Sequence, residues 1–400
     1  MKIATQTVPT SYKQTEIGVI PEDWDVQELG EVAQFERGQG LSKSDLQETG
    51  KYKCIHYGQL FSDYIELIKE VKSKTNYNGV HFLSKSNDVL VPTSDVTPRG
   101  LATASCIKEN GVLLGGGILI IRLNNGYDGT FFSYWITQNK REVLKLVKGS
   151  TVFHIYGHDM SGLRLAFPKD KEQIAIATVL SDTDSLIEKL EKLIAKKKAV
   201  KQGAMQRLLI GKKRLPGFSG EWEEKKLGKV CENVTTGKLD ANAMKKDGEY
   251  RFYTCAKEYY FIDKYAFDTE ALLVSGNGAN VGYIHYYKGK FNAYQRTYVL
   301  STFHEDIFFT KLLLDKNLKE RIRTEVNSGN TPYITMGTLT EMSILFPPRK
   351  EEQTAIATFL SDMDTEIESL KKSLSKYQQI KTGMMQQLLT GKIRLVKNNL

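Results

Sequence analysis

The sequence predicts an α+β protein in which two globular domains are separated by an antiparallel two-helix coiled coil with pseudo-two-fold symmetry. The first observation is a long repeat. Residues 173–215 and 353–395 are similar at a constant offset of 180 residues, with 24 identities in 43 ungapped positions. The second is that a tryptophan upstream of each copy, Trp24 or Trp222, precedes a Leu-Gly pair by five residues. A repeat of this size indicates two copies of one structural plan, related by a pseudo-two-fold axis.

The repeated segments are predicted to form long helices over residues 171–210 and 350–390. Each helix would be about 60 Å long at about 1.5 Å per residue. Each has an apolar stripe with heptad-like spacing and a polar middle. The stripes consist of Ile187, Leu190, Ile194, Lys197, Lys201, Ala204 and Leu208 in the first helix and Ile367, Leu370, Leu374, Tyr377, Lys381, Met384 and Leu388 in the second. The second helix can bury its stripe along the first only by running back, so the pair is expected to be antiparallel.

The segments that precede the helices differ from each other and alternate apolar runs with glycine and asparagine turns. The predicted strands cover residues 88–91, 112–114, 118–122, 271–274, 283–286 and 297–300. Short helices are expected over residues 131–147 and 306–326. Each segment is therefore predicted to be an α+β domain with a small sheet or barrel.

The repeat also suggests where the domains begin and end. We expect an N-terminal segment over residues 1–16, a first domain over 17–168, a first helix over 169–215, a second domain over 216–347, and a second helix with the C-terminal tail over 348–400. The repeat offset falls from 198 residues at the tryptophans to 180 in the helices, so the first domain is 18 residues longer. Contact residues therefore cannot be transferred from one domain to the other.

Composition places the chain among ordinary soluble proteins. It has 400 residues, of which 40% are hydrophobic and 26% are charged. No apolar run reaches the length of about 18 residues that a membrane span needs, and the N-terminus lacks the apolar core of an export signal. The four cysteines are far apart and form no CxxC pair, so neither a zinc site nor a disulfide framework is predicted. A cytoplasmic location is expected.

The positive charge is concentrated in the repeated helices. Residues 186–214 have a net charge of +8 and residues 366–394 a net charge of +4, whereas the whole chain has +9. The remaining residues are therefore slightly negative. A basic chain suggests nucleic acid as a partner, but a charged helix is just as often a solvated face.

The motifs of common enzymes are absent from the sequence. It contains no GxxxxGK[ST] loop, no GxSxG and no HExxH. Asp63 with the triplet 70–72 fits part of a metal-dependent nuclease pattern, but such triplets are common in lysine-rich chains. His154 and His158 are four residues apart without an evident third metal ligand. Residues 276–282 resemble a phosphate-binding loop, although a glycine-rich turn between strands is the simpler interpretation.

Polar loops that follow predicted strands supply the side chains that read base edges. Arginine pairs with guanine, and asparagine or glutamine pairs with adenine, in the major groove. The candidate DNA-contacting residues are Ser94, Thr97, Arg99, Thr151, His154 and Tyr156 in the first domain and Asn277, Asn280, Gln295, Arg296, Asn330 and Tyr333 in the second. A structural role remains the alternative for each residue taken alone. We predict no catalytic residue and no metal site.

Each domain ends on Phe-Pro and is followed by a Glu-Gln-x-x-Ile-Ala helix, which begins at Glu172 in the first copy and at Glu352 in the second. This arrangement closely resembles the specificity (S) subunit of type I restriction–modification systems, over nearly the whole chain. The resemblance implies two target recognition domains that each read one half of a bipartite site on double-stranded DNA. It also implies that the paired helices set the gap between the halves.

The resemblance further implies partners and cofactors. Two methyltransferase (M) subunits and restriction (R) subunits would assemble with the chain, which would have no catalytic site and bind no cofactor. SAM, ATP and Mg²⁺ would belong to the partners. The residues expected on the partner-docking helices are Leu190, Ile194, Lys197, Lys201, Leu208, Leu370, Leu374, Tyr377 and Leu388.

Two other classes of function remain open at this point. A two-domain nuclease or methyltransferase that acts alone is disfavoured by the missing nucleotide, cofactor and metal motifs. A structural adaptor that only bridges other proteins would not protect DNA in a sequence-specific way.

Overall fold

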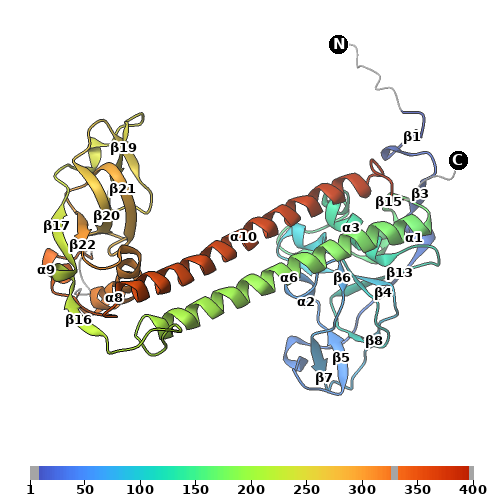
Figure 1. Cartoon of the computed structure of the whole chain (residues 1–400). Helices are drawn as coiled ribbons and strands as arrows, with labels where there is room; N and C mark the ends of the chain where they lie inside the picture. The colour runs from blue at the N-terminus through green and yellow to red at the C-terminus, as the bar shows by residue number, and fades with distance from the viewer. Residues whose placement is uncertain (1–8, 326–331, 396–400) are drawn as a thin grey trace, which may run out of the picture. The chain divides into compact units, whose positions relative to one another are not determined.

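The structure is a computed structural model that describes residues 9–325 and 332–395. It divides into two compact units (Figure 1). Unit 1 contains residues 1–191 and 372–400, and unit 2 contains residues 192–371. Each unit combines one α+β domain with one half of each long helix, so each is described by itself.

The domain of unit 1 is built on a five-stranded sheet with strand order β4-β13-β9-β11-β6. These strands are β4 (Ala33–Arg37), β13 (Ile118–Leu123), β9 (Asp88–Pro92), β11 (Ser105–Ile107) and β6 (Leu67–Ile68). Strand β9 is central in this order, and all five of its residues are buried. Helix α3 (Gly129–Gln138) packs against β9 and β11, and its Phe131 and Phe132 are fully buried in the same core.

A second sheet in unit 1 has the order β7-β5-β12-β8. Its strands are β5 (Tyr52–Ile55), β7 (Ser73–Thr75), β8 (Phe82–Leu83) and β12 (Leu113–Leu114). The short helix α2 (Gln59–Ser62) follows β5. The 3₁₀ turns of this domain are η1 (Lys43–Asp45) and η2 (Pro98–Leu101). The apolar side chains between the two sheets, including Leu90 and Ile120, form a separate buried cluster.

The other described strands of the first domain form three short antiparallel pairs. Strand β1 (Tyr12–Thr15) forms a hairpin with β2 (Gly18–Pro21), and β3 (Asp25–Glu28) pairs with β15 (Arg164–Phe167). Strand β10 (Ser94–Asp95) pairs with β14 (Phe153–His154). The remaining helices are α1 (Leu29–Val32), α4 (Lys140–Leu144) and α5 (Gly157–Ser161).

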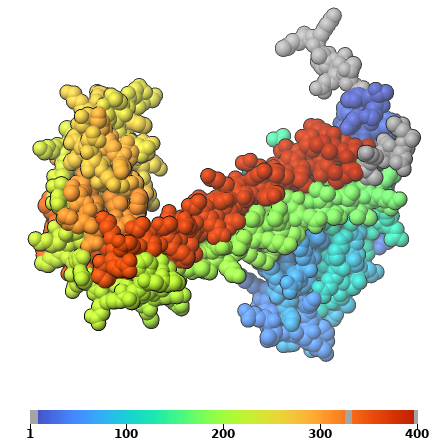
Figure 2. All heavy atoms as spheres, in the orientation of Figure 1, coloured from blue at the N-terminus to red at the C-terminus, as the bar shows by residue number. Residues whose placement is uncertain are grey.

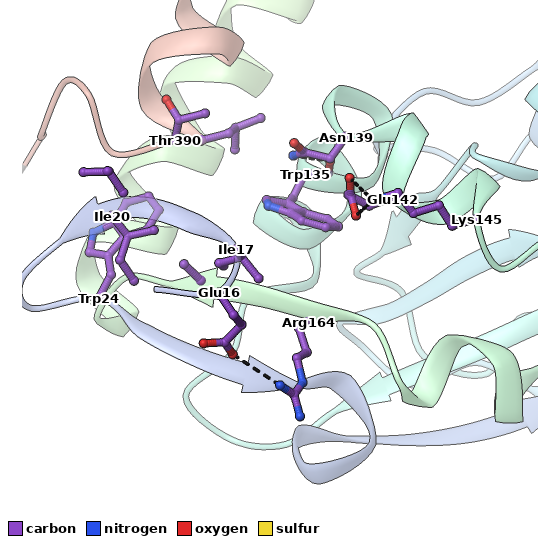
Figure 3. Close-up of a pocket in the computed structure, with 13 residues that line it drawn as sticks. Glu16, Ile17, Ile20, Trp24, Trp135, Asn139, Glu142, Lys145, Arg164 and Thr390 are labelled. Carbon is purple, nitrogen blue, oxygen red and sulfur yellow. Dashed lines mark hydrogen bonds and ion pairs between the residues drawn. The ribbon is translucent and has the colours of Figure 1, made fainter. Parts of the chain in front are cut away.

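The hairpin of β1 and β2 covers a pocket that Trp24 and Trp135 line together with residues of α4 and the end of the C-terminal helix (Figure 3). At its mouth, Glu16 of the hairpin turn faces Arg164 of β15 at 3.3 Å. Tyr12 donates a hydrogen bond of 2.9 Å to the carbonyl of Gly391. The hairpin is therefore held against the end of the C-terminal helix.

Unit 2 contains a six-stranded sheet with the order β17-β22-β20-β21-β18-β19. Its strands are β17 (Cys231–Thr236), β22 (Thr297–Phe303), β20 (Phe267–Ser275), β21 (Ile284–Ala293), β18 (Tyr250–Tyr253) and β19 (Tyr260–Ile262). Strand β16 (Glu223–Lys226) pairs with β23 (Ser343–Phe346). The helices of this domain are α7 (Leu227–Val230), α8 (Ile307–Glu325), α9 (Met336–Thr340) and the 3₁₀ turn η3 (Ala241–Ala243).

The long helices are α6 (Asp170–Leu208) and α10 (Lys350–Leu388), and they run antiparallel in both units. In unit 1, Asp184 of α6 pairs with Lys381 of α10 at 2.7 Å. In unit 2, Lys197 of α6 pairs with Glu366 of α10 at 2.6 Å, and Lys201 pairs with Asp364. As residue numbers rise along α6, the numbers of their ion-pair partners on α10 fall, as they must in antiparallel helices. Figure 2 shows the side chains of α6 (green) and α10 (red) in contact.

Each domain covers the beginning of one helix and the end of the other. The core of unit 1 includes Ile176 and Leu180 of α6 and Leu388 of α10, whereas that of unit 2 includes Leu208 and Ile356. The burial pattern of residues 171–180 is identical to that of residues 351–360. This repetition explains the sequence similarity of the helices, because equivalent residues serve equivalent cores.

The predicted fold class is confirmed in its α+β character, its two long helices and their antiparallel direction. The strands predicted over residues 88–91 and 118–122 correspond to β9 and β13. The short helix predicted over residues 131–147 is wrong in one respect, because the chain forms two helices there. Asn139 interrupts the helix with a non-helical backbone, φ −102° and ψ 39°, and α4 begins after it.

Candidate nucleic-acid interface

The first candidate surface lies where the buried strand β9 ends. The chain leaves β9 through Thr93 and forms β10, which pairs with β14. Ser94 lies opposite His154 in this ladder, and the Ser94 hydroxyl is 2.9 Å from His154 Nδ1. Two candidate loops whose paired residues are 60 positions apart in the sequence are therefore joined.

The exposed side chains of this surface differ from those that shape it. Thr97, Arg99, Thr151 and Tyr156 are exposed. The Asp95 carboxylate accepts hydrogen bonds from the Thr97 hydroxyl at 2.8 Å and from the Val96 backbone N–H at 2.7 Å. These bonds fold the loop back on itself, so the Thr97 hydroxyl has a structural role, whereas the Arg99 side chain projects from the loop.

Three rings are stacked along the second loop of this surface. The ring centroids of His154 and Tyr156 are 6.0 Å apart, and those of Tyr156 and His158 are 5.7 Å apart, with an angle of 9° between the planes in both pairs. Within the described residues, His154 and His158 belong to no group of three or more His, Cys, Asp or Glu side chains that could hold a metal ion. In this stack the Tyr156 ring lies between the two imidazoles.

The second candidate surface lies at the end of β20 in unit 2. Asn277 forms a β-bridge with Tyr333, and the Gly278 N–H donates to the carbonyl of Pro332 at 2.9 Å. The Gly276 N–H donates to the carbonyl of Arg296 at 2.8 Å. Three loops meet here as a result. Their exposed candidate side chains are Gln295, Arg296 and Tyr333.

Two other candidates in this domain have different positions. The Asn280 side chain donates to the carbonyl of Cys255 at 3.0 Å. It therefore holds its own loop to the segment that follows β18. Asn330 lies outside the described residues. Residues 276–282, which resemble a phosphate-binding loop, form the turn between β20 and β21.

The two surfaces occupy equivalent places in the two domains. In unit 1, Ser94 after the central strand pairs with His154 just before the short helix α5. In unit 2, Asn277 after the central strand β20 bridges Tyr333 just before the short helix α9. The same backbone frame thus carries a serine and a histidine in one domain and an asparagine and a tyrosine in the other. Such a frame suits two readers of different sequences.

The side chains that resemble catalytic groups have structural partners. Lys72 donates to the backbone carbonyl of Asp63 at 2.9 Å, and the Asp63 carboxylate accepts from Gln59 at 2.9 Å. Burial raises the pKa of the Cys54 thiol to about 11 and that of Cys231 to about 12, so both thiols are protonated at neutral pH. Across residues 9–325 and 332–395, no group of three or more His, Cys, Asp or Glu side chains could hold a metal ion.

Comparison with known proteins assigns the chain to a family. A family model described as the type I restriction modification DNA specificity domain matches residues 21–201 and 219–379. The chain belongs to this family. It is therefore a DNA sequence-recognition subunit of the type I restriction–modification class, as the doubled motifs predicted.

Individual relatives support the assignment. The chain is similar to the type I restriction enzyme EcoDI specificity subunit of Escherichia coli, with 42% identity over 171 residues that cover 42% of this chain and 37% of that protein. It is 24% identical to the MjaVIII specificity subunit of Methanocaldococcus jannaschii over an alignment of 416 positions, which covers 95% of each chain. The crystal structure of the type I restriction–modification S subunit from M. genitalium has the same fold, with a TM-score of 0.62, 18% identity, and coverage of 91% of this chain and 96% of that one.

Many of the residues expected to dock partner subunits instead contact other parts of this specificity subunit. Ile194, Leu208 and Leu388 are 6%, 3% and 3% exposed. Lys197 and Lys201 form the ion pairs with α10 described above. A partner that docks on the helices would therefore contact other side chains. Lys196 and Lys198 are exposed, and so are the apolar residues Val200 and Ile380.

The remaining docking candidates are partly covered. Leu190, Leu370, Leu374 and Tyr377 have intermediate exposure.

No helix in the described part of the specificity subunit has both the length and the apolar character needed to cross a membrane.

The sequence interpretation missed two sets of residues in this specificity subunit. One is the segment that follows β5, which borders the first surface. The other set forms one ion pair with a buried glutamate in each unit: Arg394 with Glu172 in unit 1 and Arg214 with Glu352 in unit 2. A signal for the second set was present, since both the Glu-Gln pair and the Gly-Lys-x-Arg motif occur in each copy of the repeat.

Proposed function

We propose that each of the two surfaces reads one half of a bipartite site on double-stranded DNA. The observation that carries this proposal is the equivalence of the Ser94–His154 and Asn277–Tyr333 pairs, which present different side chains on one frame. Arg99 and Arg296 are exposed at the two surfaces, and a guanidinium suits the O6 and N7 acceptors of guanine. The other polar candidates would contact bases or phosphates around them.

We further propose that the chain has no catalytic site and directs partner subunits to the DNA. Two methyltransferase (M) subunits and restriction (R) subunits would supply the chemistry, and SAM, ATP and Mg²⁺ would bind to them. The complex would act in the cytoplasm. The relatives named above are specificity subunits of restriction enzymes, which supports this proposal.

Exposed faces of the long helices are the proposed docking sites. Lys196 and Lys198 can meet acidic side chains of a partner or DNA phosphates but hardly base edges, because they lie on a long helix. Replacing both with alanine should leave the base preference unchanged. The expected result is weaker assembly with the methyltransferase or a smaller salt dependence of DNA binding. A changed base preference would contradict the docking role.

The direct test is methylation with purified components. The chain alone, incubated with SAM, ATP and Mg²⁺, should neither methylate nor cut DNA. Addition of the methyltransferase subunit encoded with it should give methylation at one bipartite sequence, identified by sequencing of modified bases. Methylation or cleavage by the chain alone would refute the non-catalytic role, and assembly without sequence preference would favour the adaptor.

A domain exchange tests the two-reader arrangement. Replacing residues 17–168 with the corresponding domain of another family member should change one half of the methylated sequence and preserve the other. If both halves changed, the two domains would not read independently.

A further inference from the structure

The segment between β5 and β7 is longer than its counterpart in unit 2. It spans residues 56–72, whereas the segment between β18 and β19 spans residues 254–259. Most of the extra length of the first domain is therefore inserted at one place. The insertion contains α2 and β6.

The beginning of this segment packs against the loops of the first surface. A Cβ atom placed on Gly117 would lie 3.1 Å from the Tyr57 ring, and one placed on Gly100 would lie 3.0 Å from Cε1 of Phe61. Gly100 belongs to the loop that carries Arg99. Gly100 thus allows the Phe61 ring to lie on the loop that carries Arg99. Gly117, whose carbonyl accepts from the Thr93 N–H at 2.9 Å, allows the Tyr57 ring to lie beside it.

Both rings remain open to solvent at this place. Tyr57 is 37% exposed and Phe61 is 41% exposed, and the rings contact each other edge-to-face with centroids 6.4 Å apart. A partner that covers this pair would remove apolar surface from water, which is favourable. Phe61 lies against Gly100, the residue after Arg99, so a partner that contacts Arg99 can also cover this pair.

Hydrogen bonds within the segment and to β7 fix its beginning. The Gly58 N–H donates to His56 Nδ1 at 3.1 Å, and the His56 N–H donates to Gln59 Oε1 at 3.0 Å. Gln59 Nε2 in turn donates to the Ser73 hydroxyl at 2.8 Å. Burial lowers the pKa of His56, which keeps Nδ1 available as an acceptor. The rings are therefore positioned before DNA binds, which limits the entropy lost on binding.

The equivalent segment of unit 2 also borders the candidate DNA-reading surface of its own domain. The shorter segment after β18 contacts two loops of the second surface. The Cys255 carbonyl accepts from Asn280 at 3.0 Å, and the Cys255 thiol is 3.3 Å from the carbonyl of Arg296. In both domains, the chain that follows this strand is thus built onto the candidate DNA-reading loops.

We propose that Tyr57 and Phe61 recognise the 5-methyl group of a thymine in the half-site of the first domain. The proposal rests on the proposed function of the first surface. The thymine methyl is the apolar group that the major groove presents, whereas the other base edges present hydrogen-bond donors and acceptors. The Phe61 ring has no polar atom, so a methyl group is the feature of a base edge that it fits. The thymine lies next to the base that Arg99 contacts.

Deoxyuridine tests this proposal because it removes the methyl group and keeps every hydrogen-bonding atom of thymine. Once the methylated sequence is known, each thymine of both half-sites is replaced in turn, and binding of the full chain is measured. Replacement at one position in the half-site of the first domain should weaken binding about fourfold, the effect of one buried methyl group. The same replacement should have no effect on the Phe61→Ala variant.

Two further variants control the interpretation. Phe61→Leu keeps an apolar side chain and should retain sensitivity to deoxyuridine. Tyr52→Ala removes another exposed aromatic ring of the same domain, 39% exposed on β5, and should behave like the unaltered chain. Thermal unfolding of each variant identifies a loss of folding.

The outcomes separate this proposal from the proposed function. If the half-site of the first domain contains no thymine, or if its deoxyuridine sensitivity is unchanged in Phe61→Ala, the methyl contact is wrong. In that case the loss of base preference in Arg99→Ala would still support the first surface as a reader. If Arg99→Ala and Phe61→Ala both leave the half-site unchanged, the first surface itself is misassigned.

Discussion

The guanidinium of Arg394 binds the carboxylate of Glu172, although 222 residues separate them in the sequence. Arg394 Nε and Nη2 donate to the two Glu172 oxygens at 2.7 Å each. The other side of the guanidinium donates to both oxygens of Asp23 at 2.7 and 2.8 Å. The segment after α10 is thereby joined to the start of α6 and to the entrance of the first domain.

The same relationship recurs in unit 2 with the roles of the helices exchanged. Arg214, after the end of α6, binds both oxygens of Glu352 at the start of α10. Instead of a second carboxylate, Arg214 meets the carbonyls of Ser219 and Gly220. Each helix therefore ends against the beginning of the other. This reciprocity is the pseudo-two-fold symmetry expressed in individual residues.

Replacing either arginine should destabilise its own unit. Glu172 is 2% exposed and would remain buried without its cation, a change that costs about 3–5 kcal/mol. We expect Arg394→Ala to lower the free energy of unfolding of unit 1 by this amount, and Arg214→Ala to do the same in unit 2. Denaturant unfolding monitored by fluorescence would measure both.

A matched surface pair provides the control for these variants. Arg349 and Glu351 are 3.6 Å apart, with side chains 60% and 71% exposed. Arg349→Ala should therefore change the free energy of unfolding by less than about 1 kcal/mol. Equal effects of Arg349→Ala and Arg394→Ala would show that burial of the carboxylate is unimportant.

The two tryptophans predict a difference between the units. Trp24 Nε1 donates to Glu172 at 3.2 Å, whereas Trp222 Nε1 is buried without a hydrogen-bond partner among the described residues. Phenylalanine keeps an aromatic ring and removes the N–H. Trp24→Phe should therefore cost about 1.5–3 kcal/mol more than Trp222→Phe, because only Trp24 loses a hydrogen bond to a charged group. Calorimetry of both variants measures the difference, and equal costs would contradict it.

The stability of unit 1 should depend on pH through Asp23. The hydrogen bonds from Arg394 lower the pKa of Asp23 below its ordinary value of 3.8. A carboxylate with a lowered pKa stabilises the fold above its unfolded-state pKa, and the contribution is lost as the pH falls through the folded-state value. Unit 1 should thus weaken below a pH of about 4. Asp23→Asn should be less stable at neutral pH and lose less stability on acidification; equal slopes in denaturant titrations would refute this.

Local pattern was sufficient to predict the long helices, but not what their polar positions contact. The repeated heptad spacing indicated a buried stripe, and Ile194, Leu208 and Leu388 are buried accordingly. Lys197 and Lys201 were assigned to partner docking, yet they pair with acidic residues of α10. Their partners depend on the register of the two helices. The periodicity of one helix contains no information on that register.

The candidate DNA surfaces were predictable to a similar degree. Polar residues after predicted strands marked these loops as candidate DNA contacts, but the pattern did not show which loops meet. The structure brings two of them together in the Ser94–His154 pair. The contribution of Tyr57 and Phe61 was not predictable, because their place depends on how the inserted segment folds back onto Gly100 and Gly117. Such contacts between distant segments have no periodic signal in the sequence.

The exposed arginines predict how each half-site is read. If Arg99 and Arg296 each contact a guanine through two hydrogen bonds, replacement by alanine should cost about 1–3 kcal/mol at one base position. The loss should appear on the proper site and not on a scrambled duplex. Arg99→Ala should affect the half-site of the first domain, and Arg296→Ala that of the second. Measuring affinity for both duplexes at two salt concentrations separates base contacts from phosphate contacts, because a lost phosphate contact reduces the salt dependence and weakens binding to every sequence. Equal losses on the proper and scrambled duplexes would assign these arginines to the DNA backbone.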